Sequence, residues 1–388
     1  MDQTRREQVD LGESRLAPSS ICFIERALCL REDHSRTQFR EFLSSASYRI
    51  VPIAVIGRIA TTATRVLSIP IAFHLTILVV ATIPIVLNIA LSYWSARCAG
   101  EATLWILYYS VVTLLVFEFS VALWRYLVNT GNDLNSMFAS ERDRASIEAL
   151  VLRRFDVRGQ ISSALIIGIA SVCVLHLAAP TVRPMIGLCP ASYIAVFIAA
   201  TIGVCSAHWL CQVPLIVRGL FNLPELIVHW NAPASTPAIR RLANFGAANA
   251  VMGAFLMILF MIPPLYVAAR QTTAFMMAIN GVAMIFTLTV VAIITLPIQY
   301  WLTAIIRRER AAILGALGGQ LNPLRDVVLG IGDKRRLSTV DNLANIYQSV
   351  HESRESTIDA KTLLIHSIAV ATSILPYVVQ FVARVTAR

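Results

Sequence analysis

The sequence predicts an all-α, multi-pass transmembrane helical bundle of six or seven spans with a small helical cytoplasmic lobe. Apolar runs of about 20 residues recur, as in 104–124 and 249–269, and about 20 helical residues cross the hydrocarbon core of a bilayer. Of the 388 residues, 56% are hydrophobic and 14% charged, whereas soluble domains carry roughly 25% charged residues. The charges gather between the apolar runs, which distinguishes this chain from a soluble protein with a large core.

Residues 1–66 form a basic amino-terminal region. We expect disorder in 1–20 and short helices at 21–30 and 38–43. Residues 48–67 are apolar but interrupted by arginines, two of which, Arg58 and Arg65, share a helical face. This pattern predicts a helix lying in the membrane interface with its arginines toward the headgroups. A first span beginning here is the alternative. We see no cleavable signal peptide, so we expect the first span to direct insertion.

Residues 67–306 are predicted to hold six spans. They are 68–93, 104–127, 161–179, 193–213, 249–269 and one within 275–306. The sixth apolar segment exceeds the bilayer thickness, so it either tilts or continues past the membrane as a helix. A seventh span is expected within 363–388, where 363–382 is apolar but contains His366 and Pro376. Trp105 and Trp124 stand near the ends of the second span, as in an aromatic belt.

The distribution of basic residues predicts the orientation. With a cytoplasmic amino terminus, segments 1–66, 125–160, 213–248 and 306–362 hold 10, 6, 3 and 9 Arg and Lys residues, against five on the opposite side. This alternation at every crossing is the positive-inside pattern. We therefore interpret the net charge of +10 as orienting the helices rather than as binding nucleic acid. Binding of anionic lipid or of another acidic partner is the alternative.

The two longer cytoplasmic segments are predicted to be helical. In 125–160, a turn is expected at 130–133, followed by a helix over 136–155 with an apolar stripe. In 307–362, glycines are expected to separate the helical segments 307–317 and 323–329. Ser338 is expected to cap a third helix, assisted by Asp341. Val340, Leu343, Tyr347 and Val350 form one stripe on that helix, which we interpret as core packing rather than a partner site.

Glu118 is the main candidate for chemistry because it lies among apolar residues, seven positions from Arg125. An ionised carboxylate at that depth is costly, so it should face the bundle interior, be protonated or pair with a cation. Either a proton or cation site or an interhelical hydrogen bond explains it. His74, His176 and His208 lie within or beside spans and are candidate partners of Glu118 in this intramembrane polar site. Each is also explained as a structural polar contact.

Other ligand patterns are weak. Cys205, His208 and Cys211 are three apart in turn, but no fourth metal ligand is visible. No pair of cysteines forms a CxxC motif. Small residues at spacing four, Gly246, Ala250 and Ala254, permit close helix approach but specify no oligomer.

The function classes follow from these patterns. We find no phosphate-binding loop, no zinc-protease motif and no nucleophile elbow, so we expect no enzyme activity, no cofactor and no metal. Expected partners are the lipid bilayer and either a protein partner or a second copy, with no nucleic acid. We expect a bacterial inner-membrane protein. Transport or pore formation near Glu118 is one function class, and a membrane-anchored scaffold or signalling role of the cytoplasmic segments is the other.

Overall fold

The computed structural model describes residues 38–55, 57–58, 78–79, 81–83, 85–87, 89–90, 101–186, 188–270, 274–322, 337–354, 356 and 371. These residues are nearly all helical. A single isolated bridge, between Phe138 and Leu226, is the only strand-like pairing that they show. The predicted all-α class is therefore confirmed for the described part of the chain.

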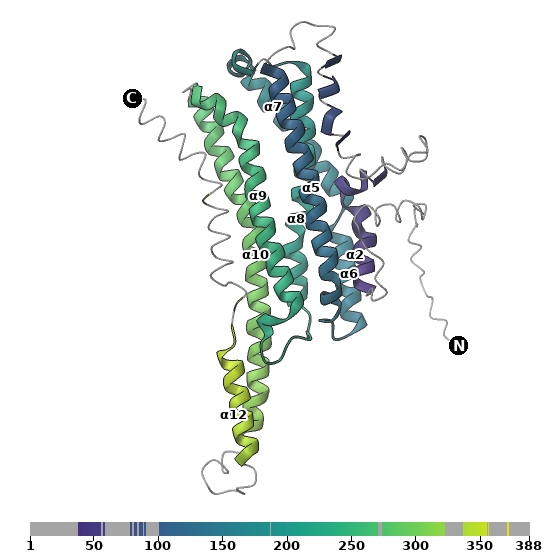
Figure 1. Ribbon diagram of the computed structural model, residues 1–388, viewed down its shortest axis with the longest axis vertical. Coiled ribbons are helices and arrows are strands. Elements are labelled where there is room, and N and C mark those ends of the chain that lie inside the picture. The colour runs from purple at the N-terminus through teal and green to yellow at the C-terminus, as the bar shows by residue number, and fades with distance from the viewer. Residues whose placement is uncertain are drawn as a thin grey trace, which may run out of the picture.

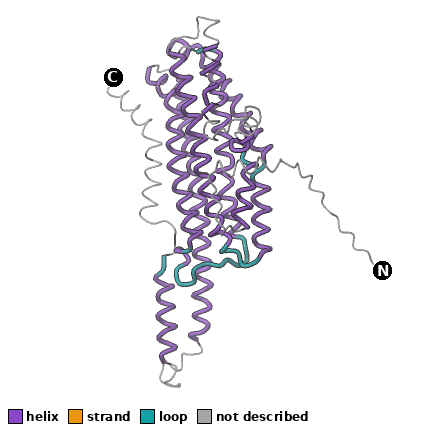
Figure 2. The backbone as a smooth tube through the Cα atoms, turned by 45° about the vertical axis from the view of Figure 1, so that its right-hand side comes forward, coloured by secondary structure: helices purple, strands orange, loops and turns teal. Residues whose placement is uncertain are grey.

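The long helices lie side by side along one axis (Figures 1 and 2). In chain order the elements are α2 (Gln38–Ser45), the short η1 (Ala46–Arg49), α5 (Glu101–Asn135), α6 (Glu141–Arg154), α7 (Val157–Ile186), α8 (Pro190–Phe221), η3 (Pro233–Ser235), α9 (Pro237–Arg270), α10 (Ala274–Leu321) and α12 (Leu337–Glu352). The end of α10 and the whole of α12 form a hairpin that projects beyond the other helices. We call that end of the bundle the α12 end.

Four segments of the described chain are long and apolar enough to cross a membrane: Ala102–Asn135, Glu141–Pro180, Pro190–Phe221 and Pro237–Phe260. The protein is therefore membrane-embedded. The most apolar stretch of the second segment is only 17% buried against other helices, compared with 50% in the first. Aliphatic side chains such as Ile166, Ile169 and Leu177 cover its exposed surface. A surface of this kind is stable against lipid but not against water.

Helix α5 corrects the prediction of a turn at 130–133, because it continues without a break to Asn135. Gly131 lies where α2 crosses α5: a Cβ atom added there would stand 2.9 Å from the Cα atom of Arg40. The glycine therefore allows close packing of two helices rather than a turn. The turn follows at 136–140, and α6 begins at Glu141, where the Ser140 hydroxyl accepts a hydrogen bond from the Asp143 N–H at 3.1 Å.

Helix α10 has 48 residues, which corresponds to about 72 Å at 1.5 Å per residue. It passes through Gly318 and Gly319, so the expected separate helix over 307–317 is wrong. Helix α12 packs against the last turns of α10 through the predicted stripe. Val340 and Val350 of this stripe are buried, and Leu343 and Tyr347 are half-buried. Ser338 lies inside the first turn of α12, which begins at Leu337, so its predicted capping position is also wrong.

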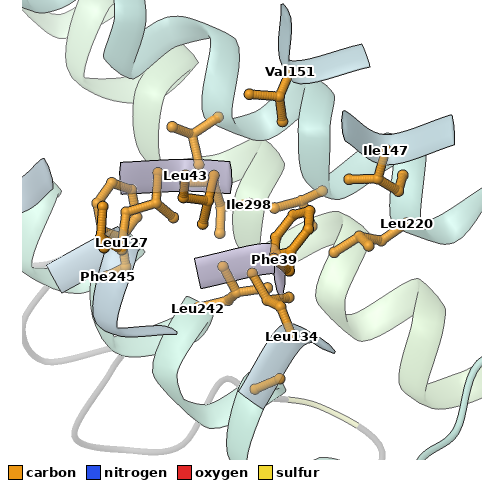
Figure 3. Packing of buried hydrophobic residues seen from close by; sticks show 14 of the residues in the cluster. Phe39, Leu43, Leu127, Leu134, Ile147, Val151, Leu220, Leu242, Phe245 and Ile298 are labelled. Carbon is orange, nitrogen blue, oxygen red and sulfur yellow. The ribbon is translucent and has the colours of Figure 1, made fainter. Parts of the chain in front are cut away.

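The largest hydrophobic core lies in the part of the bundle toward the α12 end. It combines buried side chains of α2, α5, α6, α8, α9 and α10 (Figure 3). Trp124 is fully buried there, with its ring centroid 5.7 Å from those of Phe155 and Trp209. The prediction of Trp124 as part of an aromatic belt is therefore wrong, because its ring packs against other helices instead of lying at a lipid interface.

Arginines tie the helix ends of this region together. Arg49 donates to the carbonyl of Leu152 near the end of α6, at 2.9 Å. Arg308 donates to the carbonyls of Phe221 and Leu223 at the end of α8. Carbonyls at helix C-termini lack intrahelical partners and carry partial negative charge, so a guanidinium satisfies both requirements. Its fixed, planar set of donors suits this role better than the ammonium of lysine.

Several predicted segments lie outside the described residues. They include 1–37, the stretch 59–77, the segment 323–336 and, except for one residue, the predicted last span at 363–382. The predicted first span, 68–93, is described only in short helical pieces between residues 78 and 90. The predicted helix at 38–43 is confirmed as α2, which extends two residues further.

Candidate functional site: polar groups inside the bundle

Glu118 lies on α5 and is half-buried. Its neighbours along the helix, Phe117 and Ser120, are buried, and the ring centroid of Phe119 lies 6.0 Å from that of Phe255 on α9. Glu118 is thus in the middle of a helix that packs against α8 and α9. This position is that of a carboxyl group turned in part toward the neighbouring helices.

His208 lies on α8, half-buried, and its Nδ1 atom is 3.3 Å from the Ser163 hydroxyl of α7. The Ser163 hydroxyl donates to the carbonyls of Gly159 and Gln160, at 2.8 and 3.0 Å. Asp156, at the start of α7, accepts from the N–H groups of Arg158 and Gly159. Although serine, histidine and aspartate meet here, the serine proton and the carboxylate are engaged by the backbone. The arrangement therefore anchors the start of α7 and is not built for nucleophilic catalysis.

Gln160, fully buried on α7, binds the chain segment that follows α2. Its amide nitrogen donates to the carbonyl of Arg49 at 2.8 Å, and its amide oxygen accepts from the N–H of Val51 at 3.1 Å. The Cys205 thiol of α8 points at the carbonyl of the same glutamine, with 3.8 Å between the sulfur and the oxygen. Through its side chain and its backbone carbonyl, this one residue thus joins three segments that are far apart in the sequence.

Of the predicted histidines, His176 and His208 are not brought together. His176 is exposed on α7, and its ring centroid lies 6.2 Å from that of Tyr193 on α8. Ser163, which contacts His208, is 13 residues away on the same helix, which corresponds to about 20 Å along the axis. His74 lies outside the described residues. His176 instead borders an apolar hollow of about 480 Å³ between α7 and α8, lined also by Val172, Cys173, Leu177 and Tyr193.

Two buried polar side chains of the interior were not singled out from the sequence. Asn249 on α9 is 1% exposed and Ser206 on α8 is 4% exposed, and their polar side-chain atoms have no hydrogen-bond partner among the described residues. A single asparagine or serine in an apolar run gives little signal, because the sequence does not say which helix face points inward. The only available signal was that Asn249 opens a strongly apolar run.

The interior is closed toward the α12 end by aromatic rings. The Trp124 and Trp209 rings are fully buried and perpendicular, with an interplanar angle of 90°. Phe155 and Phe245 are fully buried in the same core. At the packing density of protein interiors, these rings fill this part of the bundle.

A polar groove of about 460 Å³ lies at the α12 end, where the loop between α8 and α9 faces α12. It is lined by Asn231, Ala232, Asn345, Gln348, Ser349, Glu352 and Ser353. Amide and hydroxyl groups predominate, with one carboxylate. Such a lining can donate and accept hydrogen bonds but offers no set of groups for catalysis.

The described residues contain no group of three or more His, Cys, Asp and Glu side chains placed to hold a metal ion, and Cys205, His208 and Cys211 do not form one. Comparison of the chain with known protein families, with curated proteins and with solved structures finds no match.

Proposed function

We propose that this chain is a multi-pass inner-membrane protein of six or seven spans that binds a cytoplasmic protein partner through the hairpin of α10 and α12. The observation that carries this proposal is the continuation of α10 beyond the bundle, with α12 packed along it (Figure 1). At about 72 Å, α10 is more than twice as long as the roughly 30 Å hydrocarbon core. A helix of this length places its last turns in water.

A buried arginine links the two helices of the hairpin. Arg310, 8% exposed, donates to the carbonyls of Val350 and His351 and so fixes the end of α12 to α10. The outward face of α12 is polar and carries the groove described above. The amide and hydroxyl groups that line the groove suit a polar peptide segment of a partner, because peptide groups both donate and accept hydrogen bonds.

The cytoplasmic location of the hairpin rests on the charge distribution. Exposed arginines at the α12 end include Arg153, Arg154 and Arg307, whereas Arg183 lies near the far end of α7. Basic residues favour the cytoplasmic side of a membrane. A partner reached through the groove would therefore be a cytoplasmic protein.

A photo-crosslinker tests the proposal in the full chain in native membranes. Replacing Gln348 by p-benzoylphenylalanine puts the probe in the groove, and the same replacement of exposed Asn342 provides a control on the same helix. We expect one discrete protein adduct from position 348, none from 342, and loss of that adduct when Ser349→Arg narrows the groove. Equal adducts at both positions, or only lipid adducts, would refute the docking function.

Transport through the membrane is the second candidate function. The unpartnered polar atoms of Ser206 and Asn249, and the half-buried carboxyl of Glu118, support it. The aromatic rings that fill the core toward the α12 end argue against a permanent pore through one chain. If transport is the function, Glu118→Gln should abolish it with normal membrane expression, because the amide keeps the shape but exchanges no proton.

A further inference from the structure

Three exposed arginines meet at the turn between α6 and α7. Arg153 and Arg154 end α6, and Arg158 lies in the first turn of α7. Asp156 between them accepts hydrogen bonds from the backbone N–H groups of Arg158 and Gly159, at 3.2 and 2.8 Å. Residues 153–158 therefore carry three positive charges against one negative charge, a net charge of +2.

The guanidinium groups of Arg153 and Arg154 form no ion pair or hydrogen bond with another described residue. Other arginines of this part of the bundle are held by carboxylates, carbonyls or rings, as are Arg241 by Asp133, Arg144 by Glu148, Arg308 by the carbonyl of Leu223 and Arg218 by the ring of Trp301. The donors of the turn thus remain available to an anion from outside the chain.

The turn lies where the membrane-crossing part of α7 begins. A Cβ atom added to Gly159 of α7 would stand 3.6 Å from the His208 ring of α8, whereas one added to Gly219 of α8 would meet Leu150 of α6. From His208 to Gly219, α8 continues for 11 residues, or about 16 Å. Helix α6 therefore packs on the part of α8 that lies beyond α7, and the arginines stand at the boundary.

Beyond Arg158, the exposed surface of α7 becomes apolar within one turn. Ile161 is three residues away, or about 4.5 Å along the axis, and Leu165 and Ile169 continue the same exposed face. A bilayer has a hydrocarbon core of about 30 Å and a total thickness of about 40–45 Å, so each headgroup layer is about 5–8 Å thick. Arg158 therefore lies at headgroup level, next to a face of α7 that lipid chains can cover.

We infer that the turn between α6 and α7 binds the phosphate of an anionic phospholipid, whose acyl chains lie along the exposed face of α7. Guanidinium groups bind phosphate oxygens through parallel hydrogen bonds. A zwitterionic phospholipid balances its phosphate with its own cation, so the net charge of +2 favours an anionic lipid. The site lies apart from the docking groove and does not depend on the proposed function.

Lipid competition on the full chain tests the inference. The purified protein is placed in mixed micelles with equal amounts of dioleoylphosphatidylglycerol and dioleoylphosphatidylcholine, which share their acyl chains. Native mass spectrometry then measures how much of each lipid is bound. The test variant combines Arg153→Gln, Arg154→Gln and Arg158→Gln, which removes the three cations of the turn.

A matched control variant loses the same charge elsewhere. It combines Arg142→Gln, Arg240→Gln and Arg307→Gln, all at exposed positions toward the α12 end. Arg142 is 12 residues before Arg154 on α6, or about 18 Å further from the turn. An arginine at an anionic surface raises affinity about fivefold. We therefore expect the preference for phosphatidylglycerol to fall about 100-fold in the test variant and to remain in the control.

Three outcomes would overturn the inference. Equal preference for phosphatidylglycerol in the two variants would show that the turn is not the site. A parent protein that binds both lipids equally would show that no anionic lipid is selected, and this comparison needs no variant to fold. Displacement of the bound lipid by inorganic phosphate at the same concentration would show that the turn binds free phosphate and that the face of α7 contributes nothing.

Discussion

Arg310 should determine whether α12 stays attached to α10. Its guanidinium is 8% exposed and donates to two carbonyls at the end of α12, those of Val350 and His351. Hydrogen bonds from a charged donor contribute about 1.5–3 kcal/mol each. The Arg310→Met variant keeps much of the apolar stem but loses both bonds, and the carbonyls recover part of the loss by binding water when α12 opens. We therefore expect the local opening free energy of α12 to fall by about 3 kcal/mol.

Hydrogen exchange measures this change directly. A loss of about 3 kcal/mol corresponds to roughly 100-fold faster exchange of the α12 amides, since each 1.4 kcal/mol is a factor of ten. A helix of 16 residues is marginal without its packing partner, so the amides of α12 should respond as a group. Exchange in α5 and α8 should remain unchanged.

Arg307 supplies the matched control, because it stands three residues earlier on α10 and is exposed. Arg307→Met removes the same charge and adds the same side chain, and we expect no acceleration in α12. Equal exchange rates in the two variants would refute the role assigned to Arg310 and remove the link between α10 and α12 on which the docking proposal depends.

Two further predictions concern the bundle. Gly131→Val should lower the melting temperature in detergent by an amount that corresponds to about 1–3 kcal/mol, because its Cβ would meet the Arg40 backbone at 2.9 Å. Gly253→Ala, with no atom within 4 Å of the new Cβ, should be neutral or slightly stabilising. Equal shifts in the two variants would contradict the close packing of α2 on α5. Glu118→Gln should leave the melting temperature nearly unchanged, because glutamine keeps the hydrogen-bonding capacity of the side chain. Glu118→Leu removes that capacity and should lower the melting temperature modestly. If Gln lowers it as much as Leu does, the fold needs the charge itself.

The apolar runs of the sequence predict α7 and α8 as long helices because hydropathy and length are local properties of the chain. The bounds of the helices follow less well. The last eight residues of α5 and the first twelve of α9 are more polar than the spans, and they are helical in the structure because α2 and α10 pack against these helices. Gly131 shows the same limit, since a glycine in a polar stretch predicts a turn until its close neighbour on α2 is known.

The candidate site was only partly predictable. Glu118 and His208 stand out as ionisable residues in apolar runs, and the structure places both on bundle helices. The contact between His208 and Ser163 depends on the register between α7 and α8, which no local pattern encodes. Trp124 resembles an interface residue in the sequence, yet it is fully buried. Which face of an apolar helix points inward is decided by its neighbours, and Ser206 and Asn249 become visible only in the assembled bundle.

Site-specific labelling from the two sides of the membrane tests whether the bundle presents its α12 hairpin to the cytoplasm. Cysteine is introduced at exposed positions at opposite ends, as Asp341→Cys on α12 and Arg183→Cys on α7. Intact cells are treated with an impermeant thiol reagent, and modification is identified at each position by peptide mass spectrometry. The native Cys189 is buried, so it cannot report which side of the membrane it faces. We expect labelling at position 183 in intact cells and at 341 only after permeabilisation. Labelling at 341 but not at 183 in intact cells would show that the hairpin lies outside the cell.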